Sequence, residues 1–126
     1  MVGLVLVSHS ATLASGLVEL IAQLAPDVTV LTAAGTDDGR IGTSPDAVAA
    51  ALGSADSGDG VVVIPDLGSA VLSVRLALED APADRTVLVD APFVEGAVSA
   101  AVTAGTGATL DEVVAAAKEA REIPKF

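Results

Sequence analysis

Four short apolar runs, each followed by a segment with helical spacing, restrict the fold of this chain more than any other feature. Each run is rich in β-branched residues and is predicted to form a strand: Val2–Val7, Val28–Ala33, Gly60–Ile64 and Thr86–Val89. The first run is continuously apolar, which is typical of a strand that is buried on both faces. Strands that alternate with helices predict an α/β fold, in which a mostly parallel four-stranded sheet has helices on both faces.

Start and stop signals predict five helices between and after these strands. The first helix ends before Pro26 and carries an apolar stripe at helical spacing, made of Leu13, Leu17, Leu20, Ile21 and Leu24. The second has Ser44 as its N-cap and Pro45 at its first position. It runs through Leu52 to a turn over Gly53–Gly60.

The other three helices follow the third and fourth strands: Gly68–Asp80, Val94–Ala104, and a last helix from Thr109 to Arg121. Pro82 follows the first of these and Gly105 follows the second, and both residues favour helix ends. Thr109 and Glu112 have the spacing of a capping box, which marks the start of the last helix.

The chain has 126 residues, so residues 1–126 are interpreted as a single domain. Its net charge of -11 disfavours nucleic acid and anionic membrane surfaces, and it either attracts a partner that carries a basic patch or only aids solubility. The absence of cysteine excludes disulfides and thiolate chemistry. The start lacks the basic region of a signal peptide and no apolar run is long enough to span a membrane, so we expect a cytoplasmic protein.

The predicted topology indicates where a ligand would bind. The simplest strand order for a chain of this length is flavodoxin-like, with the first and third strands as neighbours. Open α/β sheets bind ligands where the carboxyl ends of such strands meet. The two loops that meet there are Ser8-His9-Ser10 and Pro65-Asp66-Leu67-Gly68-Ser69.

His9 is the only histidine, and it lies between the first predicted strand and the first predicted helix. A lone histidine is often a structural core or capping residue, but this position favours a nucleophile that accepts a phosphoryl group. Helix amino ends offer free N–H groups and positive potential to an anion. We predict that these N–H groups, with the hydroxyls of Ser8, Ser10 and Thr12, position the phosphate.

Asp66 ends the third predicted strand and is expected beside His9. A carboxylate that accepts the proton of one ring nitrogen fixes the tautomer and leaves the other nitrogen free to attack. The alternative is that Asp66 only caps the following helix. Gly68 lets the backbone approach a ligand closely, and Ser69 can donate to a phosphate oxygen. Which ring nitrogen is phosphorylated stays open, although the solvent-facing one is favoured.

Two further segments are predicted to border this crevice: the glycine-rich loop Gly35–Ser44, with Arg40 as a cation, and Asp90–Gly96. Asp37 and Asp38 resemble part of a calcium loop, but the remaining ligand spacing is missing, so we expect no metal. The chain has neither a P-loop nor a dinucleotide-binding glycine motif. We therefore expect it to bind no nucleotide or other cofactor itself.

Four motifs follow one another along nearly the whole chain: Val5-Leu6-Val7-Ser8-His9-Ser10; Gly35-Thr36-Asp37-Asp38-Gly39 with Ile41-Gly42-Thr43-Ser44; Asp66-Leu67-Gly68-Ser69-Ala70; and Asp90-Ala91-Pro92 with Val94-Glu95-Gly96-Ala97. Together they resemble the phosphoryl-donor subunit of phosphoenolpyruvate-dependent dihydroxyacetone kinase, a relative of mannose-type enzyme IIA domains. The second motif distinguishes this subunit from its sugar-transport relatives.

The resemblance implies a mannose-type enzyme IIA fold and a phosphotransferase with a phosphohistidine intermediate on His9, hydrogen-bonded to Asp66. It implies that the histidine phosphocarrier HPr, charged by enzyme I from phosphoenolpyruvate, donates in trans. Delivery would be to ADP on the nucleotide-binding subunit of dihydroxyacetone (glycerone) kinase, so ADP or ATP lies on that partner. It also implies a homodimer. Mannose-type relatives exchange a terminal strand, and whether this chain does so, with residues 122–126 after Arg121, stays open, as does the final acceptor.

Other functions are weighed against this one. There are two main alternatives. The chain is an enzyme IIA component of a mannose-type sugar phosphotransferase system, or it is a non-catalytic module that binds an anion or a partner. A response-regulator receiver phosphorylated on Asp66 is disfavoured because Ser8-His9-Ser10 stands where receivers carry an acidic pair for Mg²⁺. A histidine phosphatase or mutase is disfavoured because it needs a second histidine and clustered arginines.

Overall fold

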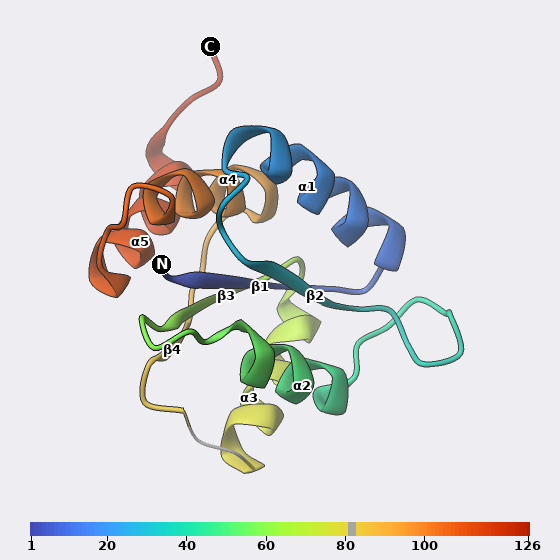
Figure 1. The fold of residues 1–126 in the computed structure, drawn as a ribbon. Helices are drawn as coiled ribbons and strands as arrows, with labels where there is room; N and C mark the ends of the chain where they lie inside the picture. The colour runs from blue at the N-terminus through green and yellow to red at the C-terminus, as the bar shows by residue number, and fades with distance from the viewer. Residues whose placement is uncertain (81–82) are drawn as a thin grey trace.

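Strands and helices alternate along the chain in the computed structural model, which describes residues 1–80 and 83–126 (Figure 1). The elements are β1 (Gly3–Ser8), α1 (Ala11–Leu24), β2 (Val30–Ala34), α2 (Pro45–Ala55), β3 (Val61–Pro65), α3 (Gly68–Asp80), β4 (Thr86–Leu88), α4 (Phe93–Ala104), α5 (Leu110–Glu119) and the short 3₁₀ turn η1 (Ala120–Glu122). The predicted α/β class is confirmed. Pro82, expected to follow the third helix, lies outside the described residues.

The four strands form one parallel sheet in the order β2-β1-β3-β4. This is the flavodoxin-like order that the sequence predicted, with β1 and β3 as central neighbours. Val7 of β1 pairs with Pro65 of β3, so both strands end at the same edge of the sheet. The loops that follow β1 and β3 therefore meet there.

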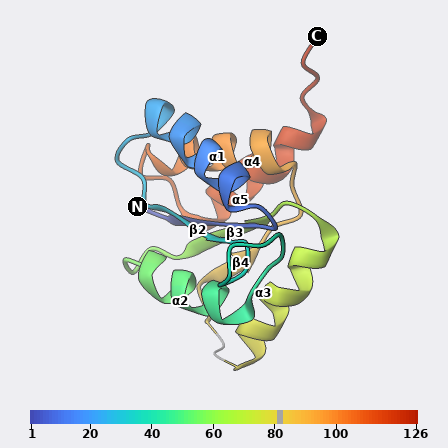
Figure 2. The ribbon, with the colours of Figure 1, turned by 90° about the vertical axis from the view of Figure 1, so that its right-hand side faces the viewer.

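The two central strands bury side chains on both faces, as their apolar sequences indicate. One face packs against α1, α4 and α5, and the other against α2 and α3 (Figure 2). The strand residues on the first face are Leu4, Leu6, Val62 and Ile64. Those on the second face are Val5, Val7, Val61 and Val63. Successive strand residues thus alternate between two cores, and a rigid sheet supports the edge at which His9 lies.

The predicted caps of the second and last helices are confirmed. Ser44 caps α2 by accepting a hydrogen bond from the Ala47 N–H, and Pro45 occupies the first helical position. Thr109 and Glu112 form the complete capping box at the start of α5. Each cap satisfies N–H groups that have no partner within the helix.

Several predicted boundaries differ from the structure. β2 begins at Val30 rather than Val28, because the Val28 N–H bonds back to the Ala25 carbonyl in the turn after α1. α2 continues past Leu52 to Ala55, although the sequence indicated a turn from Gly53 onward. Leu52 and Ala55 are buried against the sheet, and this packing outweighs the low helix propensity of glycine.

The apolar stripe predicted for α1 is only partly buried. Leu17 and Ile21 lie in the core together with Ala14, whereas the other three leucines of the stripe are exposed: Leu13, Leu20 and Leu24. The contact face of α1 also includes Val18, so it is shifted around the helix relative to the predicted stripe, toward smaller side chains. None of the described helices combines the length and apolar character needed to cross a bilayer.

Candidate active site

The site begins where β1 passes into α1. β1 ends at Ser8, and α1 starts three residues later with Ser10 as its N-cap. His9 is therefore held between two regular elements at the carboxyl edge of the sheet. On the neighbouring strand, Asp66 follows β3 directly, and its N–H donates to the Val7 carbonyl at 2.9 Å. Parallel pairing of β1 and β3 thus brings His9 and Asp66 together.

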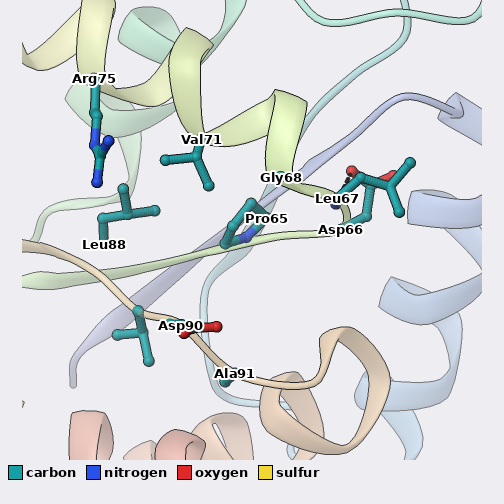
Figure 3. Close-up of a pocket in the computed structure, with 10 residues that line it drawn as sticks. Pro65, Asp66, Leu67, Gly68, Val71, Arg75, Leu88, Asp90 and Ala91 are labelled. Carbon is teal, nitrogen blue, oxygen red and sulfur yellow. Dashed lines mark hydrogen bonds between the residues drawn. The ribbon is translucent and has the colours of Figure 1, made fainter.

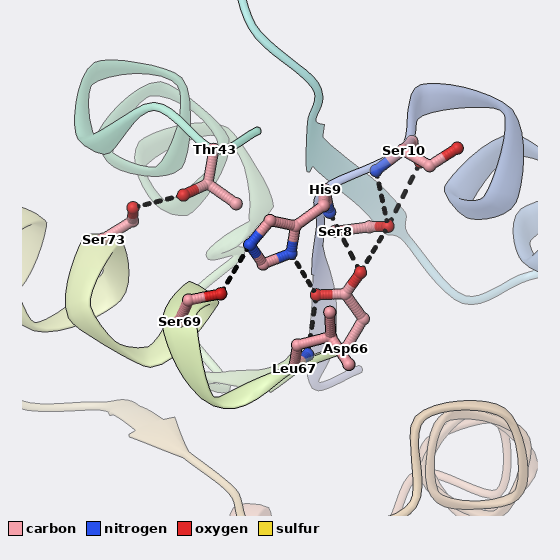
Figure 4. A network of polar contacts seen from close by, with 8 residues as sticks. All are labelled: Ser8, His9, Ser10, Thr43, Asp66, Leu67, Ser69 and Ser73. Atoms are coloured by element: carbon pink, nitrogen blue, oxygen red, sulfur yellow. Dashed lines mark hydrogen bonds and ion pairs between the residues drawn. The ribbon is translucent and has the colours of Figure 1, made fainter. Parts of the chain in front are cut away.

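The carboxylate of Asp66 accepts four hydrogen bonds, two on each oxygen (Figure 4). Oδ2 accepts from the Ser8 hydroxyl at 2.9 Å and from the His9 N–H at 3.0 Å. Oδ1 lies 2.9 Å from His9 Nδ1 and accepts from the Leu67 N–H at 2.7 Å. All of these partners come from residues next to the ends of β1 and β3, so the sheet itself fixes the carboxylate.

Asp66 is held in its ionised form by these contacts. Burial raises the pKa of its carboxyl group, but the hydrogen bonds from the His9 N–H, the His9 ring, the Ser8 hydroxyl and the Leu67 N–H outweigh burial. The pKa of Asp66 therefore lies below its ordinary value. Its side chain is only 8% exposed, so the negative charge acts on the His9 ring with little screening by water.

The two ring nitrogens of His9 have different partners. Nδ1 faces the Asp66 carboxylate, which accepts only, so Nδ1 carries the proton. Nε2 then has a free lone pair, and the Ser69 hydroxyl lies 2.7 Å from it in position to donate. Since the His9 side chain is 19% exposed, Nε2 is the nitrogen that a second molecule can reach once the Ser69 hydroxyl rotates away.

The other predicted phosphate-positioning residues lie around the ring in different settings. Ser8 is fully buried and its hydroxyl bonds to Asp66, while the Ser10 hydroxyl caps α1 by accepting from the Leu13 N–H. Thr12 is exposed on the first turn of α1. Gly68 and Ser69 begin α3. The ring edge that carries Nε2 thus faces the start of α3, one of the two helix starts that the sequence had indicated.

The loop between β2 and α2 reaches the site through its backbone. The Gly42 N–H donates to the His9 carbonyl at 2.9 Å, and the Gly35 N–H donates to the Ser8 carbonyl at 3.1 Å. Gly35 has a φ of 73°, a conformation that favours glycine. Arg40, predicted to face the crevice, is instead largely exposed and pairs with Asp38 at 3.2 Å.

A cavity of about 400 Å³ opens on the other side of Asp66, toward β4 (Figure 3). Asp90 and Ala91 form part of its wall, opposite Val71 and Arg75 of α3, whereas the sequence had predicted that their segment borders the crevice of His9. Asp66 lines this cavity, but neither His9 nor Ser69 is among its lining residues. The cavity borders the carboxylate and not the nucleophile.

The arrangement has the parts that nucleophilic catalysis by an imidazole requires. One nitrogen is protonated and braced by a carboxylate, and the other presents a lone pair at the surface. The sequence identified His9, Asp66 and Ser69. It also predicted that the loop Gly35–Ser44 borders the crevice, but it did not indicate that the Gly42 N–H reaches the His9 carbonyl, because nothing in the spacing of the loop shows which of its groups turn toward the site.

Comparison with protein families identifies one match over most of the chain. The model of the PTS system fructose IIA component, EIIA-man, matches residues 3–114. The crystal structure of EF1359, a protein of unknown function, has a TM-score of 0.85 and 38% sequence identity, and covers 94% of this chain and 95% of its own. The fold is therefore the one expected for mannose-type enzyme IIA domains.

Two curated relatives carry the name of a phosphoryl donor subunit, DhaM, of PEP-dependent dihydroxyacetone kinase. The one from Listeria innocua is 39% identical over 106 residues, which cover 81% of this chain and 85% of the relative. The one from Providencia stuartii is 39% identical over 127 residues, which cover 95% of this chain and 27% of the relative. The chain thus spans about a quarter of the length of the longer relative.

Proposed function

Because the chain belongs to the EIIA-man family of PTS components, we propose that it is the phosphoryl donor subunit of a dihydroxyacetone kinase and carries the phosphoryl group on His9. The observation that carries this proposal is the pair of contacts on the ring. Asp66 lies 2.9 Å from Nδ1, and Ser69 lies 2.7 Å from Nε2. The names of the relatives support the choice of kinase over a sugar transporter.

In the uptake step, the Nε2 lone pair attacks the phosphorus atom of a phosphohistidine on the donor, for which we propose HPr. The nitrogen–phosphorus bond of the donor breaks, and its electron pair returns to the donor nitrogen. Positive charge develops on the His9 ring, and the carboxylate of Asp66 stabilises it through Nδ1. The transition state of phosphoryl transfer is loose, so most of the catalysis comes from positioning and electrostatics.

In the delivery step, an oxygen of the terminal phosphate of ADP attacks the same phosphorus atom. The bond between phosphorus and Nε2 breaks, and the electron pair returns to Nε2. We propose that the nucleotide-binding subunit of the kinase holds this ADP, so the carrier needs no nucleotide site or metal of its own. The Ser69 hydroxyl, freed from Nε2, can donate to a phosphoryl oxygen throughout.

The setting of this relay is part of the proposal. We place it in the cytoplasm, since phosphoenolpyruvate is made there. We also propose a homodimer. β4 is the last strand in the sheet order, so its outer edge is unpaired among the described residues and is open to pairing with a second copy. Sedimentation equilibrium tests the dimer: a monomer at micromolar concentration contradicts it.

The central experiment follows the mass of the chain during incubation with phosphoenolpyruvate, enzyme I and HPr. We expect the wild-type chain to gain one phosphoryl group, in a form that is labile in acid and stable in base. His9→Gln should gain none while unfolding at a temperature close to that of the wild type. Adding the nucleotide-binding subunit with ADP should then remove the group and form ATP.

Each alternative has its own outcome in this experiment. A hydroxylamine-sensitive adduct that persists in His9→Gln would assign the phosphate to Asp66. Discharge to the IIB component of a sugar transporter, but not to the kinase subunit, would make the chain a sugar-transport component. An unchanged mass of the wild-type chain would leave only a non-catalytic binding role.

A further inference from the structure

Two polar residues are buried as whole residues in the part of the chain that the structure describes, Ser8 and Ser73. Ser8 belongs to the site, because its hydroxyl bonds to Asp66. Ser73 lies further along α3 and takes no part in the contacts of the ring. A buried hydroxyl destabilises a protein unless it is hydrogen-bonded, and alanine at such a helix position would be more favourable. The serine at this buried position of α3 therefore needs a structural explanation.

The partner of Ser73 is Thr43, in the loop between β2 and α2. The two hydroxyl oxygens lie 2.5 Å apart, and either can donate (Figure 4). Thr43 is half-buried, and it lies directly before Ser44, the N-cap of α2. This hydrogen bond links a loop to the body of a helix that is distant in sequence.

The loop end that Thr43 anchors is also the end that touches His9. Gly42, the preceding residue, donates its N–H to the His9 carbonyl at 2.9 Å. The exposed tip of the loop closes on itself, since the Thr36 N–H donates to the Arg40 carbonyl and the Arg40 N–H donates to the Thr36 hydroxyl. The hydrogen bonds of the tip stay within the loop, whereas the Thr43–Ser73 bond ties the end of the loop next to Gly42 to α3.

The helix end of the link leads back to the same histidine. Ser73 lies four residues after Ser69, so the two side chains share one face of α3. The Ser69 hydroxyl contacts Nε2 at 2.7 Å. The contacts thus form a closed circuit that runs from the His9 backbone through the loop to α3, and from α3 to the His9 ring. Figure 4 shows the Thr43–Ser73 pair on the Nε2 side of the ring, away from Asp66.

We propose that Thr43 and Ser73 are positioning residues, whose hydrogen bond sets the distance between the end of β1 and the first turn of α3. Asp66 holds the ring from the Nδ1 side, and the Thr43–Ser73 pair holds it from the Nε2 side through Gly42 and Ser69. The expected effect of this hydrogen bond on the rate of phosphoryl transfer rests on the proposed function. Its expected effect on the position of the His9 ring is independent of that function.

Three variants and a rescue test this proposal. Thr43→Val and Ser73→Ala each remove one hydroxyl with little change in shape, and Thr43→Ser keeps the hydroxyl as the rescue. In the double variant both partners are apolar, so no polar group is left unpaired and its stability should exceed that of the less stable single variant. Thr32→Val, on the exposed edge strand β2, and Ser54→Ala, on the surface of α2, are the matched controls.

We expect each single variant to slow phosphoryl uptake from phospho-HPr roughly tenfold at saturating donor, with KM unchanged, because misplacement of the ring affects the transition state more than docking. The double variant should be as slow as either single one, since both changes break one bond. Thr43→Ser should transfer at nearly the wild-type rate. A double variant that is stable but takes up phosphate slowly shows that the hydrogen bond acts on the position of the ring and not on folding.

A second readout needs no donor protein. The chemical shifts of the two His9 ring nitrogens report the hydrogen bond at Nε2. Both shifts should change in Thr43→Val and in Ser73→Ala, and neither should change in the Thr32→Val and Ser54→Ala controls. Ring shifts that stay at their wild-type values in both variants overturn the proposal, as does a wild-type uptake rate in the stable double variant. If the wild-type chain takes up no phosphate, the proposed function fails, and the ring shifts alone decide the positioning role.

Discussion

Two aspartates follow neighbouring strands at the same edge of the sheet, yet their surroundings differ. Asp66, after β3, is 8% exposed in its side chain and accepts four hydrogen bonds. Asp90, two residues after β4, is 89% exposed in its side chain and pairs with Arg121 at 2.7 Å. Both positions carry the same carboxylate, but only Asp66 is enclosed by donors.

The difference lies in what the neighbouring strand provides. β3 pairs with β1 on one side, so Asp66 meets the Ser8 hydroxyl and the His9 backbone and ring. β4 pairs only with β3 among the described strands, and the chain turns from its end into α4. A polar residue at the end of a parallel strand therefore becomes part of a site when the adjacent strand end also carries polar groups.

The largest effect expected from this comparison is on phosphoryl transfer. Asp66→Asn should slow uptake from phospho-HPr by about 10²-fold or more, because the amide lacks the charge that stabilises the ring and its NH₂ group faces donors. Asp90→Asn, the matched control, should stay within about twofold of the wild-type rate. The measurement is single-turnover transfer followed by mass. Equal rates for the two variants would mean that enclosure of the carboxylate has no role in the chemistry.

The next largest effect concerns the other ring nitrogen. Ser69→Ala should slow uptake roughly tenfold, since a hydrogen bond to a charged phosphoryl oxygen contributes about 1.5 kcal/mol. Ser99→Ala, on α4, is the control. Quench-flow measurement of uptake at saturating phospho-HPr checks this. A larger loss in Ser69→Ala than in Asp66→Asn would reverse the order of importance that the geometry indicates.

The sequence was sufficient for the part of the site that depends on strand order. Parallel pairing of the first and third strands brings Asp66 to His9, and strand order follows from the alternation of strands and helices. Which of the two nearby helix starts the Nε2 edge of the His9 ring faces was not predictable from the sequence. It depends on the Ser69 rotamer and on the Gly42 and Thr43 contacts, which are tertiary contacts without a periodic signal.

The difference between local and tertiary contacts also explains which features of the helices were predicted wrongly. Caps such as Ser44 and Thr109 act within a few residues, so they were predicted correctly. The exposure of Leu13 and Leu20 depends on which face of α1 the sheet and α4 cover, and the apolar spacing of α1 does not determine that face.

A smaller effect is expected on stability, and its sign follows from the lowered pKa of Asp66. A carboxyl group with a lower pKa in the folded state stabilises the fold above its unfolded pKa, and this contribution is lost as the pH falls through the folded value. At neutral pH, Asp66→Asn should therefore be less stable than the wild type by about 1–3 kcal/mol. Urea unfolding from neutral to acidic pH should show this difference shrinking with acid. A constant difference would mean that the ionised form is not what stabilises the fold.

The smallest effect is expected at the end of β4. Arg121 donates to the Asp90 carboxylate at 2.7 Å and to the Asp90 carbonyl at 3.2 Å, and both side chains are largely exposed, Arg121 to 53% and Asp90 to 89%. Exposed pairs of this kind contribute about 0–1 kcal/mol and weaken as salt rises. Arg121→Gln should therefore unfold in urea within about 0.5 kcal/mol of the wild type, with the gap closing at high salt. A salt-independent loss beyond about 1.5 kcal/mol, or a tenfold slower phosphoryl uptake, would show that the end of β4 is coupled to the site. The contrast between the two aspartates would then reflect their exposure in the isolated chain and not their roles, since a partner bound over β4 could enclose Asp90 as the end of β1 encloses Asp66.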